Sequence, residues 1–389
     1  MNRTVARLLK ITLPAAAVAT LVLMLATEVW VRATLDPRKG APGLFIADAA
    51  RGLRLAPNYN GWFAGVPVRI NSLGLRDDRE YPLAKGPHTF RILVLGDSVT
   101  FGHGSIEENT YPRLLEGLLR TWRPEVDWQV WNAAVPGYNT SQELAHLLEL
   151  GPVAKPDLVV VGFYLNDLME NADVDAPGGV AAVAATVRGL AQRHLYSFDL
   201  YRKAWLTMRW KLSASDAYRR RVEALDSEER MFVRPSDVID RDLQQLTPYD
   251  RLSDKDIQGL RCQYGQTPDP GLEAAIRTSP DWKRWLDATR RLQALHTSAA
   301  YRIVFFLNVV PPVCQDGDLF YDGGGSIENN LFLSVLSDTT PAVSVFDAFL
   351  HRRPSQMPYA QAHAIGNSNL TKAETLFEFL QRRRLVPPS

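Results

Sequence analysis

The chain has little cysteine and almost no excess of charge of either sign. Only two cysteines occur in its 389 residues, Cys262 and Cys314, and no Cys/His cluster has the spacing of a zinc site, which argues against a structural metal. The two thiols are either paired, in an exported protein, or free and buried; the sequence leaves both readings open. The formal net charge of +1 provides no overall field that would favour nucleic acid as a partner. Low-complexity tracts and internal repeats are also missing, so we expect a globular protein.

An apolar stretch without a charged residue runs from Ile11 to Thr27, and Val29–Val31 extends it past Glu28. About twenty residues span a bilayer, so the stretch is long enough to cross one. A cleaved signal peptide is the alternative, but no clear small-x-small cleavage motif follows the apolar core. We therefore expect residues 1–35 to be an uncleaved membrane anchor. The globular part is then membrane-anchored on the periplasmic or extracellular side.

Residues 36–86 and 87–389 differ in pattern, which predicts a lead-in segment and a main domain. The lead-in is rich in glycine, proline and asparagine. Its best strand candidate is Val66–Ile70. Because Pro67 cannot donate a ladder hydrogen bond, this run favours an edge strand or a hairpin.

Strands and helices alternate in the main domain. Apolar runs predict strands at 91–95, 128–131, 158–163, 303–307 and 343–346. Amphipathic patterns predict a helix behind Thr110, a helix opened by a capping box of Thr140 and Glu143, and a closing helix over 371–380. Between about 175 and 300 the chain has the pattern of several helices, which indicates an inserted cap. The alternation predicts an α/β fold, a three-layer sandwich around a mostly parallel sheet.

The first predicted strand is followed directly by Gly96-Asp97-Ser98-Val99-Thr100-Phe101-Gly102. A strand that breaks into a glycine-flanked turn holds a small hydroxyl at the carboxyl edge of a sheet, where open α/β folds place their chemistry. The tripeptide GDS is common by chance, whereas GDSxTxG behind an apolar run is rare. We therefore interpret Ser98 as a nucleophile rather than as a turn residue.

Three further sites follow in order: Gly137 after the second strand, Asn166 after the third, and His363 shortly before the closing helix. With the GDS block they resemble the four sequence blocks of the SGNH (GDSL-type) hydrolases, over roughly 91–380 apart from the insertion. Tyr164 departs from the glycine usual in the third block. The resemblance implies an SGNH/flavodoxin-like fold with Ser98 as nucleophile and His363 as base. It assigns the oxyanion hole to the backbone N–H groups of Ser98 and Gly137 and to the side-chain amide of Asn166.

The family normally carries an aspartate two or three residues before its histidine, where this chain has Ala360 and Gln361. Three alternatives stay open. A backbone carbonyl or the Gln361 amide oxygen orients a Ser–His dyad, a carboxylate from elsewhere such as Asp347 substitutes, or the site binds its ligand with little turnover. Of the other histidines, His103 is expected to line the pocket, and His351 is the only other late candidate for the base.

These features predict a serine esterase or acyl hydrolase that forms an acyl-enzyme at Ser98 and needs neither cofactor nor metal. Its expected substrate is an O-acylated envelope or extracellular ester, borne by a small molecule, lipid or glycan, and its N-terminal helix contacts the membrane. An O-acyltransferase and a non-catalytic polysaccharide- or lipid-binding protein on the same fold are the alternatives. Tryptophans of the insertion either stack on a substrate or, as we expect, pack the helices together; they are Trp205, Trp210, Trp282 and Trp285.

Overall fold

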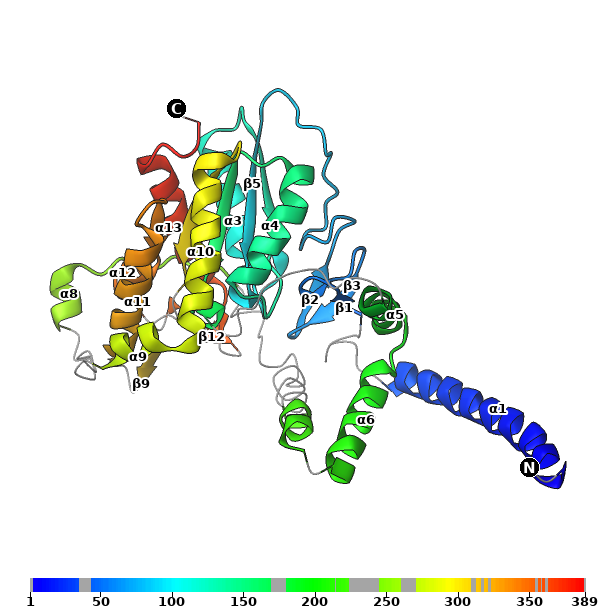
Figure 1. The fold of residues 1–389 in the computed structure, drawn as a ribbon. Coiled ribbons are helices and arrows are strands. Elements are labelled where there is room, and N and C mark those ends of the chain that lie inside the picture. Colours follow the sequence, from blue (N-terminus) through cyan, green and yellow to red (C-terminus); the bar gives the residue numbers. More distant parts are fainter. Residues whose placement is uncertain are drawn as a thin grey trace.

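A five-stranded parallel sheet lies at the centre of the molecule, with its strands in the order β11-β8-β7-β5-β6 (Figure 1). The strands are β5 (Thr89–Gly96), β6 (Asp127–Asn132), β7 (Leu158–Phe163), β8 (Arg302–Leu307) and β11 (Ala342–Ser344). The computed structural model describes residues 3–34, 43–168, 180–213, 215–223, 245–259, 271–308, 313–315, 318–320, 323–353, 356–357, 359–360 and 363–387.

The chain enters this sheet at β5 and winds outward in both directions. β6 is added on one side of β5, and β7, β8 and β11 follow on the other side. The winding therefore reverses between β5 and β7, and ligands of open α/β sheets bind outside the carboxyl ends of the strands at such a reversal. The predicted α/β fold with a parallel sheet is confirmed. The last strand is shorter than predicted because the Phe346 N–H donates to the Ser344 hydroxyl at 3.1 Å, where α12 (Phe346–Leu350) begins.

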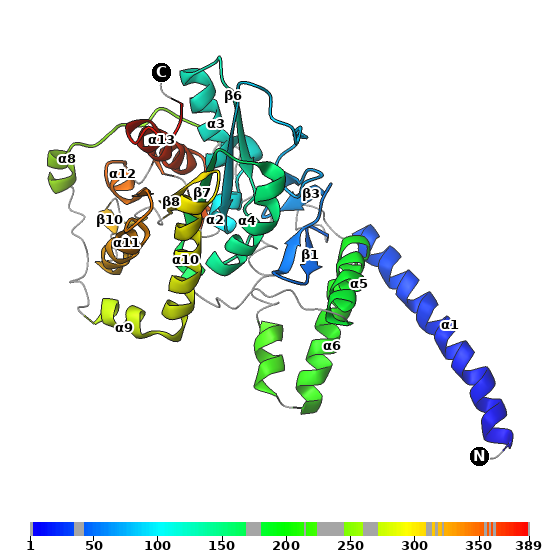
Figure 2. The same cartoon turned by 45° about the horizontal axis from the view of Figure 1, so that its top comes forward.

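Helices cover both faces of the sheet, which completes three layers (Figures 1 and 2). One face carries α3 (Tyr111–Trp122) and α13 (Asn367–Arg382), and the other carries α4 (Thr140–Ala154), α10 (Pro280–Ser298) and α11 (Gly323–Leu336). Side chains alternate across a strand, so Val160 packs with the first set of helices and its neighbour Val161 with the second. All six residues of β7 are buried, as its continuous apolar run predicted.

The start of α4 differs from the sequence prediction. Asn139 is the N-cap: its side chain accepts from the Gln142 N–H at 3.1 Å, and the Gln142 side chain accepts from the Asn139 N–H at 3.0 Å. The capping box predicted for Thr140 and Glu143 is therefore wrong by one residue. Glu143 is buried in the protein interior and does not reach back to a helix terminus.

Two hairpins form the lead-in segment: β1 (Phe45–Asp48) with β2 (Gly52–Leu55), and β3 (Asn60–Phe63) with β4 (Val66–Arg69). The hairpin predicted at Val66 is confirmed, with Pro67 on its exposed side. The hairpins bury their apolar residues against Phe101 and Tyr138, which lie next to two of the predicted site motifs. The lead-in thus packs near the carboxyl edge of the sheet.

Helix α1 (Arg3–Thr34) projects away from the rest of the protein (Figure 1). Its segment Thr12–Thr34 has a mean hydropathy of 1.8 and no buried residue, so it is long and apolar enough to cross a membrane, a property that signal sequences share. The described part of the predicted insertion is mainly helical. Besides α10 it contains α5 (Val180–His194), α6 (Phe198–Ser213), a helix over 216–223, α8 (Asp254–Gly259) and α9 (Leu272–Thr278).

Two short hairpins near the end of the chain were not predicted from the sequence. β9 (Val313–Gln315) pairs with β10 (Asp318–Phe320), and β12 (Tyr359–Ala360) pairs with β13 (His363–Ala364). Such brief strands have too few residues to show a period of two. The second hairpin carries the predicted base.

Candidate active site

Ser98 begins the short helix α2 (Ser98–Phe101) directly after β5. Asp97 is the N-cap of this helix, and its Oδ1 accepts a hydrogen bond from the Val99 N–H at 2.8 Å. Because Asp97 is completely buried, the aspartate of the motif holds the turn and does not face solvent. The arrangement leaves Ser98 at the carboxyl edge of the central strand.

Thr100 packs over two glycines that face each other in the sheet. Gly96 and Gly162 are register partners in β5 and β7, and a Cβ on either would lie 2.2 Å from Thr100 Oγ1. The Tyr111 hydroxyl donates to the same oxygen at 3.1 Å. The first glycine of GDSxTxG is therefore required by the packing of Thr100 against the sheet. Gly162 was missed, although a glycine inside a buried strand is a known sign of a close approach.

His363 lies beside Ser98 although 265 residues separate them in sequence. Its Nε2 is 2.8 Å from Ser98 Oγ, within hydrogen-bond distance. The predicted base lies on β13, immediately before α13, so the closing helix of the sandwich holds the hairpin at the carboxyl edge of the sheet. The structure thus brings the predicted nucleophile and the predicted base together.

The ring of His363 is stacked on a second imidazole. His103 lies 4.2 Å away between ring centroids, with 21° between the ring planes. Phe63 of the β3–β4 hairpin meets His103 edge-on at 5.1 Å, and His103 is almost completely buried. His103 was expected to line the pocket; it supports the ring of the predicted base. Nothing in the local sequence of His103 indicated this contact, since it joins segments far apart in the chain.

The group that orients His363 from its other side stays a prediction. Ala360 is the register partner of His363 in the β12–β13 hairpin, and Gln361 lies outside the described residues. Asp347 has an exposed side chain on α12, and its backbone carbonyl lies 2.6 Å from Nδ1 of His351. The other ring nitrogen of His351 lies 3.0 Å from Asp254, so this second late histidine is engaged elsewhere.

The predicted oxyanion donors lie at the carboxyl ends of three neighbouring strands. Ser98 follows β5, Gly137 follows β6, and Asn166 follows β7 in a short 3₁₀ turn, beside the Asp97 carboxyl. Gly137 has a φ of +83°, which few other residues adopt without strain. Within the described ranges, neither the Ser98 N–H nor the Gly137 N–H donates a hydrogen bond to the protein. Both are therefore available to an anionic oxygen.

Four fully buried ionisable groups lie behind the turn. Burial raises the pKa of Asp97 to about 6, and it raises the pKa values of Glu143 and Asp167 well above their usual range. The three carboxyls also repel one another when charged. Burial lowers the pKa of Lys372 to about 7, against the attraction of Asp97. The sequence singled out Asp97 as part of the GDS motif and Glu143 as a capping residue, but it did not show that the four groups meet, because they come from segments far apart in the chain.

Arg76 holds the loop behind α2. Its buried guanidinium donates to the carbonyls of Phe101 at 2.5 Å, Gly102 at 2.6 Å and Ser105 at 2.5 Å. Burial lowers the pKa of Arg76 to about 10, which still leaves it charged at neutral pH. Hydrogen bonds from a charged donor are stronger than neutral ones, so this contact fixes the segment that follows Ser98.

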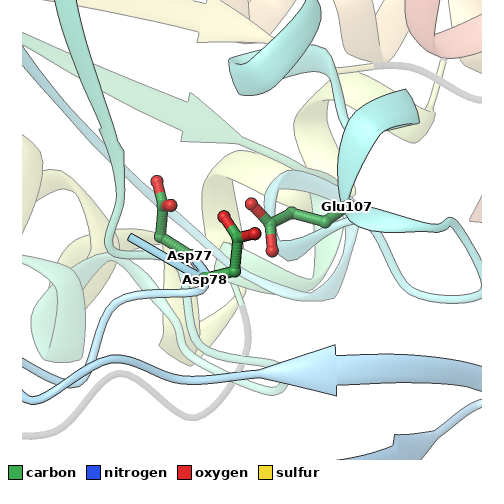
Figure 3. Close-up of side chains that lie close together, drawn as sticks. All are labelled: Asp77, Asp78 and Glu107. Atoms are coloured by element: carbon green, nitrogen blue, oxygen red, sulfur yellow. The ribbon is translucent and has the colours of Figure 1, made fainter. Parts of the chain in front are cut away.

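The carboxylates of Asp77, Asp78 and Glu107 point toward one another at a separate place (Figure 3). Arg113 Nη2 lies 3.5 Å from Asp77, 3.0 Å from Asp78 and 2.6 Å from Glu107, so the Arg113 guanidinium already pairs with all three carboxylates. Burial and the charge of Asp77 raise the pKa of Glu107 to about 7. We interpret this group as an internal ion-pair network.

Two of the insertion tryptophans pack in the core, as expected. Trp282 and Trp285 lie against Phe332 on one face of the sheet, whereas Trp205 on α6 is half-exposed. Cys262 lies outside the described residues, so the pairing of the two cysteines stays a prediction.

Residues 94–258 match the family model described as "GDSL-like Lipase/Acylhydrolase family". No curated protein sequence matches the chain. Among solved structures it is similar to Axe2, an acetylxylan esterase from Geobacillus stearothermophilus, and to LAE5, an α/β hydrolase enzyme from the metagenome of Lake Arreo, Spain. Each has 13% identity and a TM-score of 0.36, over 75% of this chain and 94% of that chain. A two-domain esterase (CEX) active on acetylated mannans has 12% identity and a TM-score of 0.33, over 77% of this chain and 51% of that chain. These TM-scores are low, so the likenesses say nothing about the site or its substrate.

The matched region begins in β5 and contains Ser98, Gly137 and Asn166, and the tertiary structure adds His363 from beyond it. The family match and the parallel sheet agree with the order of the sequence blocks. Residues 94–258 therefore carry a GDSL-like lipase/acylhydrolase domain, which supports an ester hydrolase as the activity.

Proposed function

We propose that Ser98 is the nucleophile of this ester hydrolase and His363 its general base. The observation that carries the proposal is the 2.8 Å contact between His363 Nε2 and Ser98 Oγ. A serine hydroxyl is a weak nucleophile at neutral pH unless a neighbouring base takes its proton, and an imidazole at hydrogen-bond distance is suited to that step.

In the proposed reaction, Nε2 takes the Oγ proton as Oγ bonds to the ester carbonyl carbon. The carbonyl oxygen becomes an oxyanion that the N–H groups of Ser98 and Gly137 and the amide of Asn166 stabilise. The intermediate then collapses: the bond to the alcohol breaks, and the leaving oxygen takes the proton from His363. Water attacks the resulting acyl-enzyme with His363 as base, which releases the acid and restores the Ser98 hydroxyl.

Stacking on His103 supports the base where the family's usual aspartate is missing. A ring held flat against a buried neighbour keeps its plane, so Nε2 stays aimed at Ser98. Stacking does not choose the imidazole tautomer. A hydrogen-bond acceptor for Nδ1 is therefore part of the proposal, and a backbone carbonyl, Gln361 or a carboxylate such as Asp347 can serve.

We also propose that α1 anchors the protein in a membrane and that the hydrolase domain lies on the periplasmic or extracellular side. The accessible substrates are then O-acylated envelope or extracellular esters. The length and hydropathy of Thr12–Thr34 and the lack of a buried residue in it support the anchor. Labelling of intact cells with a membrane-impermeant amine reagent tests the side, because a cytoplasmic domain would stay unlabelled.

Full-length protein in detergent provides the test of the site. Turnover of an activated short-chain aryl ester and labelling by a fluorophosphonate are measured for Ser98→Ala, His363→Gln and Asn166→Ala. Losing either the serine or the histidine of a nucleophile–base pair lowers kcat by on the order of 10⁴-fold or more. Losing one oxyanion donor lowers it by roughly 10²- to 10³-fold. His351→Gln is the matched control, since this histidine is engaged with Asp254.

Ser98→Ala protein that keeps its turnover would contradict the proposed nucleophile. Equal losses in His363→Gln and His351→Gln would contradict the proposed base. Labelling of Ser98 combined with turnover only when an alcohol acceptor is added would identify the enzyme as an O-acyltransferase. Neither labelling nor turnover on a broad panel, including an acetylated oligosaccharide, would favour the non-catalytic binding protein.

A further inference from the structure

Three large aliphatic side chains of helix α5 point away from the protein. Val183, Val187 and Leu190 share one face of the helix and are between 56% and 64% exposed. Gly189 faces inward, where a Cβ would lie 3.2 Å from the carbonyl oxygen of Ala47 in β1. An amphipathic helix of a globular protein normally buries its apolar face. Here these apolar side chains are exposed, which indicates an apolar partner outside the described residues.

Helix α6 has an exposed apolar face as well. Trp205, Met208 and Leu212 lie at helical spacing on this face and are between 50% and 78% exposed. Leu200 in the first turn is 45% exposed. Cationic side chains flank this face: Arg202, Arg209 and Lys211. The Arg209 guanidinium lies 5.8 Å from the centre of the Trp205 ring. Aromatic and aliphatic residues on one face with Lys and Arg beside them are typical of helices that lie in the membrane interface.

The turn between α5 and α6 is fixed to the C-terminal end of α1. Glu28 accepts hydrogen bonds from the N–H groups of Tyr196 at 3.0 Å and Ser197 at 2.8 Å, and from the Ser197 hydroxyl at 2.7 Å. Arg32 donates to the His194 carbonyl at 2.7 Å, and its guanidinium lies 4.2 Å from the centre of the Tyr196 ring. In both views α5 lies between the β1–β2 hairpin and this end of α1 (Figures 1 and 2).

We propose that α5 and α6 lie in the headgroup region of the bilayer that α1 enters, with their exposed apolar faces inserted toward the acyl chains. The reason to choose a lipid surface over a second protein is continuity: the contacts of Glu28 and Arg32 hold both helices at the membrane end of the candidate anchor. The flanking cations fit the phosphates of anionic phospholipids. This inference rests on the anchoring role proposed for α1.

The exposed apolar faces of α5 and α6 would give the protein a second membrane contact besides the anchor. A single helix allows the attached domain to rotate and tilt, whereas two interfacial helices joined to it restrict both motions. Because α5 packs on β1, this restriction extends to the lead-in hairpins, and through Phe63 to the histidine pair of the site. The hydrolase domain is then held at a set orientation to the membrane.

The test uses the full-length protein in liposomes of phosphatidylcholine and phosphatidylglycerol. An environment-sensitive fluorescent amino acid replaces, one at a time, Val187, Met208, Arg188 or Leu21, and lipids with a nitroxide on the acyl chain serve as quenchers. Arg188 is the matched control, since it is exposed on α5 but points about 100° away from Val187. Leu21 lies in α1 and reports on the anchor itself.

We expect the probes at positions 187 and 208 to be quenched several-fold more strongly than the probe at 188. Quenching at position 21 without quenching at 187 and 208 would overturn this inference and leave the anchor in place. Absence of quenching at position 21 would overturn the anchor together with the inference. A third outcome also overturns the inference. If the probes at 187 and 208 are not quenched and their emission shifts to the blue as the protein concentration rises, the exposed faces contact a second copy of the chain and not lipid.

Discussion

Alanine at Gly162 is expected to disturb the site from inside the sheet. The new Cβ would lie 2.2 Å from Thr100 Oγ1, 2.7 Å from the Tyr111 hydroxyl and 3.1 Å from Asn308 Nδ2. Thr100, Tyr111 and Asn308 are all buried, so none of them can turn toward solvent to make room. The strand or the helix that carries Thr100 must therefore move.

The size of the effect follows from these contacts. Cβ atoms essentially never approach a neighbour within 3.0 Å, so Thr100 has to retreat by roughly 0.8 Å from its present 2.2 Å. Overpacking of this kind costs about 1–3 kcal/mol, and loss of the hydrogen bond between Tyr111 and Thr100 adds about 1 kcal/mol. Thr100 shares α2 with Ser98, and a misplacement of about 1 Å lowers turnover by up to about 10²-fold. We expect the free energy of unfolding to fall by about 2–4 kcal/mol.

Urea unfolding followed by circular dichroism and turnover of an aryl ester measure both effects. The matched control is Gly117→Ala on α3, where no atom lies within 4 Å of the new Cβ. This substitution should stabilise the helix by about 0.5–1 kcal/mol and leave turnover unchanged. Adding Thr100→Ala to Gly162→Ala removes the closest contact, so part of both losses should be recovered in a double-mutant cycle.

Wild-type stability and turnover in Gly162→Ala would refute the reasoning, because the close approach would then not constrain the site. Strictly additive effects of Gly162→Ala and Thr100→Ala would refute it in a second way. They would mean that the two side chains do not compete for the same space.

Three further outcomes are expected. His103→Ala should lower kcat by up to about tenfold with little change in KM, because His363 loses the ring stacked on it. His103→Phe keeps a ring against His363 and Phe63 and should retain most activity. Equal losses in both variants would contradict a stacking role. Arg76→Met should lower the free energy of unfolding by about 1–3 kcal/mol in chemical denaturation, because three buried carbonyls lose a charged donor. Lys372 has a pKa of about 7 in the native state, so between pH 7 and 10.5 only the unfolded chain binds a proton there, and the free energy of unfolding rises with pH. Lys372→Met should flatten this rise in thermal unfolding. An unchanged slope would contradict a neutral, buried lysine in the native state.

Elements with many residues in one pattern could be predicted from the sequence. β7 was predicted with its observed bounds because six consecutive apolar residues require burial on both faces. Local signals were less reliable. Asn139 and Thr140 are both good N-cap residues, and only the structure shows that Asn139 caps α4 with Gln142 while Glu143 is buried.

Ser98, Gly137 and Asn166 could be named as site candidates from the sequence, because each follows a predicted strand and parallel strands end at one edge of the sheet. His363, by contrast, was assigned by resemblance, and only the folded hairpin places it 2.8 Å from Ser98. Three contacts were decided by tertiary structure alone: His103 on His363, Arg76 on the loop after α2, and the α5–α6 turn on α1. Each joins segments with unrelated local patterns, and a contact between distant segments leaves no period or spacing in the sequence of either one.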